Sequence, residues 1–379
     1  MKKTALLILL ASLSMVSCKK KGCTDENAVN YSAEAKKDDG SCTYYETPST
    51  YQFTDNDGKS TVSYSGQTDR LNQMEEMTTY MKSGNSSALS GANLKAMFMN
   101  TGDNGGGNFS FSSSKQMMDK CFPSDTALFI DWIDSLVIAS ADHASTASAG
   151  QAGTLSSGTS TYLFDANGKE FVQLIEKGLM GAVFMYQATN VYLGTSKMDV
   201  DNTTAVDAAA GKYYTKMEHH WDEAFGYFGA PVDFPTNTTD ARFWAKYCNK
   251  RDAELGCNAT MMNAFLAGRT AIVNNDMTTR DQSISTIVSA WERFCAAQAV
   301  AYFQGAQNNF GTDDAKFLHE LSEAYAFVMC LKYVPVETRV INFSTIDDIL
   351  SNTIGNNFWA VTNTDLTTAI NELNSTYGF

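Results

Sequence analysis

Proline is scarce along the whole of this 379-residue chain. A proline inside a helix removes a backbone hydrogen bond and clashes with the preceding turn, so its scarcity leaves long helices undisturbed. The stretches between the prolines carry apolar residues at the three- and four-residue spacing of amphipathic helices. Strand-like alternation is weak outside residues 51–64. The sequence therefore predicts an all-α fold of packed helical bundles. The prolines are Pro48, Pro123, Pro231, Pro235 and Pro335.

The predicted helices fill most of the chain after residue 68. Two segments rich in small polar residues, 100–114 and 140–161, are predicted to be surface loops, and His143 in the second is expected to be solvated. The helical region, residues 49–379, exceeds one usual domain, which favours two bundles or one elongated body. Helices are expected at 69–81, 124–140, 168–193, 211–228, 239–247, 257–273, 279–304, 312–333 and 365–373.

Residues 1–17 have the pattern of a bacterial lipoprotein signal peptide. Two lysines precede an apolar run, and Ser17 precedes Cys18,. The run is too short to span a membrane as a helix. We expect cleavage before Cys18, lipidation of Cys18, and a lipid anchor in the cell envelope, at the outer membrane and facing either side of it. The alternative is an ordinary cleaved signal with a chance cysteine.

Cysteine usage agrees with an oxidising compartment. Cys23 and Cys42 bracket an Asp-rich stretch that is too small to form its own core, so a disulfide is expected there. Residues 18–48 are therefore predicted to be a stapled module with a linker. A second disulfide is expected between Cys248 and Cys257. The pairing of the remaining cysteines is left open, and these are Cys121, Cys295 and Cys330.

The charge balance indicates which kinds of binding partner suit the chain. With 42 acidic against 28 basic residues, the formal net charge is −14. Phosphate binding needs a basic surface, so nucleic acid is not expected as a partner. Cations are favoured instead, although the acidic residues are spread along the chain and indicate solubility more than one site.

Two adjacent histidines stand out because the chain has only four. At helical spacing, His219 and His220 lie four and three residues before Glu223, so all three side chains converge. Imidazole and carboxylate at this spacing form helical metal sites when other elements add ligands. The alternative is a solvated helix face or a structural His–carboxylate pair. Asp222 is expected to lie near the site, and the surrounding pocket is expected to include Glu218, Trp221, Tyr227 and Glu323.

A second histidine has a similar setting. His319 is followed four residues later by Glu323 in a strong helical pattern,. If the helices 211–228 and 312–333 are adjacent, His319 and Glu323 share a cavity with His220 and Glu223. The alternative is a histidine at the edge of the core that bonds only to Glu323. Several familiar catalytic motifs are missing, including the His-Glu-x-x-His zinc motif and phosphate-binding loops.

Three stretches carry a family resemblance: residues 51–71, residues 218–229 and residues 319–325. Together they resemble the lipoprotein family called domain of unknown function 4856. Through His220-x-x-Glu223 that family is similar to the imelysins, the insulin-cleaving membrane peptidase group, and to the allied periplasmic iron-uptake proteins. The resemblance implies two helical bundles with a site between them, and a role in envelope iron or metal acquisition. Imelysins usually carry a glycine where Glu218 stands in this chain.

The leading functional hypothesis is a non-enzymatic envelope lipoprotein that binds a metal ion or a metal-bearing ligand for uptake. Its partners would be iron or zinc, or a metal chelate, together with outer-membrane uptake components. His220 and Glu223 would be ligands, with His219, Asp222 and His319 nearby. A second hypothesis is an imelysin-type metallopeptidase in which Glu223 is the base. A third is a surface glycan- or protein-binding lipoprotein with structural histidines.

Overall fold

The computed structural model describes residues 19–379, and the predicted signal peptide and Cys18 lie outside them. The chain divides into two compact units, one ending at Glu46 and the other spanning Thr47–Phe379. The boundary lies close to the predicted end of the stapled module. Residues 47–379 form one compact unit, so their division into two bundles stays a prediction.

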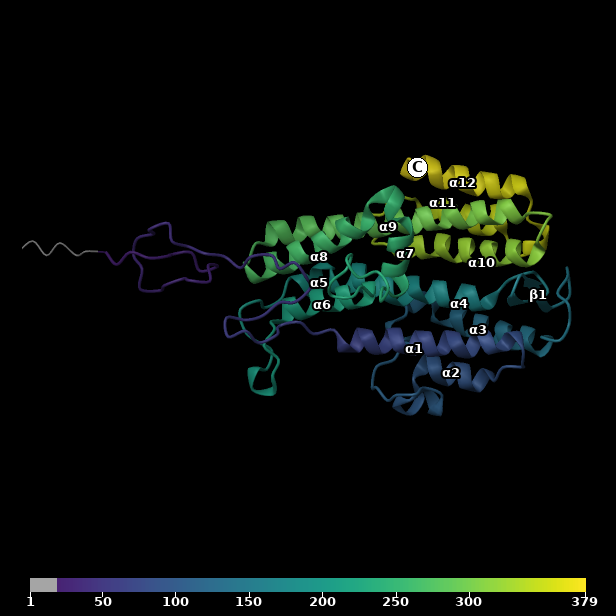
Figure 1. Cartoon of the computed structure of the whole chain (residues 1–379), viewed down its shortest axis with the longest axis horizontal. Helices are drawn as coiled ribbons and strands as arrows, with labels where there is room; N and C mark the ends of the chain where they lie inside the picture. Colours follow the sequence, from purple (N-terminus) through teal and green to yellow (C-terminus); the bar gives the residue numbers. More distant parts are fainter. Residues whose placement is uncertain (1–18) are drawn as a thin grey trace, which may run out of the picture. The chain divides into compact units, whose positions relative to one another are not determined.

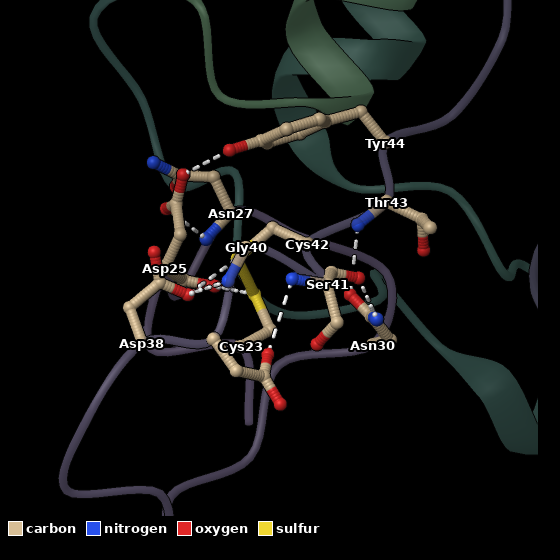
Figure 2. Close-up of a disulfide and its surroundings, with 11 residues drawn as sticks. Cys23, Asp25, Asn27, Asn30, Asp38, Gly40, Ser41, Cys42, Thr43 and Tyr44 are labelled. Atoms are coloured by element: carbon tan, nitrogen blue, oxygen red, sulfur yellow. Dashed lines mark hydrogen bonds between the residues drawn. A yellow bond between two sulfur atoms is a disulfide. The ribbon is translucent and has the colours of Figure 1, made fainter. Parts of the chain in front are cut away.

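The N-terminal unit is held by a disulfide and by turns. Cys23 and Cys42 are bonded as predicted, across a separation of 19 residues (Figure 2). Short polar side chains bind the backbone around it: Asn30 Oδ1 accepts from the Thr43 amide at 2.9 Å, and the Tyr44 hydroxyl donates to Asp25 at 2.5 Å. Such side-chain bonds stabilise loops that have no ladder of backbone hydrogen bonds.

The second unit is helical, which confirms the predicted all-α fold. Within residues 19–379 no helix is long and apolar enough to cross a membrane. The helices are α1 (Ser65–Lys82), α2 (Gly91–Met99), α3 (Thr126–Ala141), α4 (Phe171–Leu179), α5 (Thr195–Met198), α6 (Lys216–Phe228), α7 (Phe243–Leu255), α8 (Cys257–Val273), α9 (Met277–Asn309), α10 (Asp314–Cys330), α11 (Phe343–Asp347) and α12 (Asn363–Tyr377).

The predicted loop 140–161 and the strand-like segment 51–64 both differ from expectation. A hairpin of β1 (Gly153–Ser157) and β2 (Ser160–Phe164) lies partly in the predicted loop. Its turn contains Gly158 at φ 58°, a backbone conformation that glycine adopts without strain. Residues 51–63, the leading segment, form only an isolated bridge between Thr54 and Ser60. The alternation there serves to bury Tyr51 and Phe53 against helices.

The helices of the second unit pack side by side around α9. Figure 1 shows α8, α10 and α12 against this long helix, with α4 under α10 and α1 beyond α4. The interior is rich in aromatic rings, and Trp221, Trp244 and Trp291 are fully buried. Gly268 on α8 lets α6 approach closely, because a Cβ there would lie 2.1 Å from the Trp221 ring. Aromatic packing thus fixes the position of α6 in the unit.

The predicted helix 168–193 is only partly α-helical. After α4 the chain continues as π-helical turns over Met180–Met185 and Gln187–Tyr192. A π turn accommodates an extra residue and is frequent at functional sites. These turns lie against α6, and they bring Tyr192 to the histidine pair.

The predicted disulfide between Cys248 and Cys257 is wrong. Both residues are free, buried thiols, and Cys257 Sγ donates to the Cys248 carbonyl at 3.0 Å. Cys257 opens α8 directly after α7, and its thiol bonds to the preceding helix instead of to a second sulfur. The other thiols are also free and buried, namely Cys121, Cys295 and Cys330.

Candidate functional site

Helix α6 begins and ends with strong local signals. The Thr215 side chain accepts from the Glu218 amide, and the Glu218 side chain accepts from the Thr215 amide, which forms a capping box,. The helix ends at Gly229 in the left-handed conformation, φ 79°,. Between these ends, Trp221 and Phe225 face the core, which leaves the histidines on the flank of the buried stripe.

One side of α6 binds a buried arginine of α8. Arg269 donates from Nη1 to Glu218 at 2.7 Å and from Nε to Asp222 Oδ1 at 3.0 Å. Asp222 Oδ1 also accepts from the Tyr51 hydroxyl at 2.8 Å, and Oδ2 accepts from the Ser63 amide at 2.9 Å. Burial raises the pKa of Asp222 to about 6, while Arg269 opposes that rise,. Both oxygens of Asp222 are therefore engaged away from the histidines.

The predicted convergence of His219, His220 and Glu223 is present. His220 Nδ1 lies 3.1 Å from Glu223 Oε2, and His219 Nε2 lies 3.9 Å from the same oxygen. The other carboxylate oxygen accepts from Gln67 of α1 at 3.0 Å. Burial raises the pKa of Glu223, but the His220 hydrogen bond and the His219 charge outweigh burial, and the pKa is lowered. Glu223 is therefore ionised at neutral pH.

The hydrogen bonds fix which imidazole nitrogen carries the proton. His219 Nδ1 lies 2.9 Å from the Ser63 carbonyl oxygen, which can only accept, so Nδ1 carries the proton. Burial lowers the pKa of His219, so its Nε2 holds a lone pair. Opposite ionised Glu223, His220 Nδ1 also donates, which leaves its Nε2 unprotonated in the neutral ring. Two lone pairs and one carboxylate are then available to a ligand.

Cations and tyrosines surround this carboxylate. Arg70 of α1 is 6% exposed, and it donates to the carbonyls of Gln116 and Gly66. Burial lowers the pKa of Lys120. The charge of Arg70 lowers this pKa further, and the charge of Glu223 opposes the change. Lys120 Nζ lies 5.7 Å from the centre of the Tyr192 ring. The electrostatic potential around Glu223 is thus more positive than the negative net charge of the chain would suggest.

Tyr192 and Tyr227 form the aromatic wall. The Tyr192 ring lies 6.0 Å from both the His220 ring and the Tyr227 ring. Burial and the Glu223 charge raise the pKa of Tyr192. Among residues 19–379 the buried Tyr227 hydroxyl finds no hydrogen bond of standard geometry, although Arg70 lies near enough to oppose the rise in its pKa that burial causes.

His319 lies elsewhere in the helical unit. Its Nδ1 is 2.6 Å from Glu170, its Nε2 is 3.8 Å from Glu323, and its ring stacks on Tyr162. His319 and Glu323 line a cavity of about 830 Å³ to which none of His219, His220 and Glu223 contributes. The two histidine clusters therefore do not share this cavity.

The donor geometry does not form a closed metal site. Over residues 19–379 no group of three or more His, Cys, Asp or Glu side chains is arranged to hold a metal ion. Two imidazoles and one carboxylate meet on α6, while Asp222 is bound to Arg269 and His319 lies apart. A metal held at α6 would therefore need ligands from a bound molecule.

The residues at this site come from several parts of the sequence. Sequence reasoning placed the α6 residues because they are local to one helix. It missed Gln67, Lys120 and Tyr192, which no periodicity or motif connects to α6.

A comparison with known families identifies the family of this chain. The family described as domain of unknown function (DUF4856) matches residues 48–379. The chain belongs to this family. The match includes the leading segment, α6 and α10, so both histidine clusters lie within the DUF4856 region. No curated protein and no solved structure matches the chain.

Proposed function

We propose that this chain is a bacterial envelope lipoprotein that binds an anionic metal chelate, with iron uptake as its role. The observation that supports this most is the pair of histidines that share one ionised carboxylate. Imidazole Nε2 atoms and Glu223 supply metal ligands, and the chelate supplies the rest.

The surrounding charges favour a chelate over a bare metal ion. Arg70 and Lys120 both act on Glu223 or its neighbours, and their charges repel a free divalent cation. The same charges attract the carboxylates or other anionic groups of a chelate. The tyrosine wall adds apolar surface for an organic ligand.

The proposal is tested by titrating the purified protein with ferric citrate, haem and zinc chloride, using calorimetry and elemental analysis. We expect an iron chelate or haem to bind more tightly than zinc alone. His220→Ala should weaken binding by about tenfold or more, and Arg70→Gln should weaken chelate binding but not zinc binding. The matched control is His143→Ala, because His143 lies outside the site. Unchanged affinity in His220→Ala would contradict the proposal.

Membrane attachment through Cys18 is part of the same proposal. Metabolic labelling with a palmitate analogue should label the wild-type chain and not Cys18→Ser.

A relationship to imelysins is also proposed, on the His220-x-x-Glu223 element alone. The alternative function, an imelysin-type metallopeptidase, predicts peptide cleavage that a metal chelator inhibits and that Glu223→Gln abolishes.

A further inference from the structure

A short segment before α3, residues 115–122, brings two lysines to the α6 site. Its backbone is bonded to α1 on one side, where Gln73 Nε2 donates to the Lys115 carbonyl at 2.5 Å. On the other side it is bonded to the π-helical turns, where Gln187 Nε2 donates to the Lys120 carbonyl at 2.9 Å. These bonds fix the points at which the side chains of Lys115 and Lys120 leave the backbone.

Three lysines lie around the histidine pair. Lys120 Nζ is 5.7 Å from the centre of the Tyr192 ring, and that ring is the one beside His220. Burial and Arg70 lower the pKa of Lys120 most, and the charges of Lys197 and Lys115 lower it further. Burial likewise lowers the pKa of His219, to which the charge of Lys115 adds. Because such effects fall off with distance, the three ammonium groups are close to one another and to the site.

The positive charge of these lysines is only partly compensated. Glu223 is the carboxylate that acts on Lys120, and across residues 19–379 no ion pair of lysine involves Lys115, Lys120 or Lys197. Asp69 and Asp119 accept hydrogen bonds from neutral side chains. A half-buried ammonium group without an ion pair is unfavourable, and a bound anion would remove this cost.

We propose that Lys115, Lys120 and Lys197 form an anion subsite of the α6 site, and that the bound chelate carries several oxyanion groups that its metal leaves free. This inference rests on the proposed function and specifies its ligand. The histidines face the metal, and the free oxyanions face the lysines. Ammonium groups act as point charges toward carboxylates and phosphates alike, so the subsite selects a polyanionic chelate over a neutral one.

Three ferric complexes test this selection in calorimetric titrations of the full chain. Ferric citrate presents carboxylates, ferric pyrophosphate presents phosphates, and ferric maltol is neutral. We expect at least one anionic complex to bind about tenfold or more tightly than ferric maltol, and the tighter of the two identifies the oxyanion. Ferric maltol that binds as tightly as both anionic complexes would overturn the proposal.

Variants of the three lysines assign the selection to the subsite. The triple variant Lys115→Gln, Lys120→Gln, Lys197→Gln should weaken binding of the anionic complex by about tenfold or more and change ferric maltol binding by less than about twofold. Because Lys120 is half-buried, the double variant Lys115→Gln, Lys197→Gln is measured alongside and should lose about threefold or more. Thermal melting of each variant checks that the helical unit remains folded.

The charge-matched control changes three lysines that line the separate cavity beside His319. Lys82→Gln with Lys246→Gln and Lys250→Gln alters the net charge equally and should bind the anionic complex as the wild type does. Raising sodium chloride from about 0.05 to 0.5 M should weaken binding more in the wild type than in the triple variant, because salt screens partly exposed charges.

The outcomes separate this inference from the proposed function. Equal affinity of the wild type and the triple variant for the anionic complexes would overturn the subsite. If His220→Ala still weakens binding in that case, the proposed function holds without the subsite. A wild-type chain that binds none of the three complexes would overturn both.

Discussion

The Arg269 Nε atom donates to Oδ1 of Asp222 at 3.0 Å, and neither side chain is exposed to solvent. The same guanidinium binds Glu218 and Thr61. One arginine thereby links α8, α6 and the leading segment. Removing it would leave two buried carboxylates without a counter-charge.

We expect Arg269→Met to lower the free energy of unfolding by about 3–5 kcal/mol, the usual effect of removing one partner of a buried ion pair. Urea denaturation followed by circular dichroism measures this change. Lys95→Met is the control, because Lys95 and Asp134 form a half-exposed pair whose loss costs about 0–1 kcal/mol. An equal loss of unfolding free energy in the two variants would contradict the view that the buried ion pair contributes more than the half-exposed one.

The close contact of α6 with α8 gives a second prediction. A Cβ on Gly268 would lie 2.1 Å from the Trp221 ring and 2.9 Å from Ser283 Cβ. Gly268→Ala should therefore destabilise the chain by about 1–3 kcal/mol through overpacking. Gly66→Ala on α1 meets only the flexible end of Lys115 at 3.1 Å, so it should be neutral or stabilise by up to about 1 kcal/mol. Thermal melts that rank the two variants in the opposite order would refute the packing argument.

The stability of the helical unit should fall as pH rises past neutrality because of His319. Burial lowers the pKa of this histidine, but the Glu170 hydrogen bond and the charges of Glu170 and Glu323 outweigh burial and raise it above 6.5. The folded chain thus binds this proton more tightly than the unfolded chain. The resulting stabilisation is complete below pH 6.5 and is lost as pH rises through the folded pKa.

The measurement is the free energy of unfolding between about pH 6 and pH 8, compared between the wild type and His319→Gln. The difference between the two should shrink with rising pH. His143→Gln, which changes a histidine outside the cavity, corrects for the other titrating groups. A difference that stays constant with pH would show that His319 does not change its proton affinity on folding.

The N-terminal unit should depend on its disulfide, whereas the helical unit should not. The 19-residue separation of Cys23 and Cys42 corresponds to a stabilisation of about 3 kcal/mol by loop closure. Cys23→Ser with Cys42→Ser should therefore speed proteolysis within residues 19–46 and leave the melting of residues 47–379 unchanged. Mass spectrometry of a timed digest locates the cuts, and an unchanged digestion rate would argue against the staple.

Local features of the fold were predictable from the sequence. The predicted helix 257–273 coincides with α8, because Gly256 interrupts the chain just before a periodic apolar run. Helix α2 was missed, although Ser90 caps it through the Asn93 amide, since its nine residues carry too little periodicity. The π turns after α4 were missed because their apolar pattern resembles that of an α-helix.

The site was predictable only where it is local. The spacing of His219, His220 and Glu223 gives their convergence directly, since one helix holds them. The hydrogen bond from Gln67 to Glu223 joins residues 156 positions apart, and helical periodicity carries no information over that distance. The engagement of Asp222 by Arg269 depends in the same way on which helices become neighbours.

Ser63 lies at a mechanical junction. Its carbonyl oxygen contacts His219 and its amide binds Asp222, so one peptide segment holds both sides of α6 just before α1 begins. Tension applied to the chain from its N-terminal side would load Tyr51, which binds Asp222 of α6, and Thr61, which binds Arg269 of α8, before it reached Ser63. Of these contacts, those of the buried Asp222–Arg269 pair would therefore bear such a load before the histidine pair does.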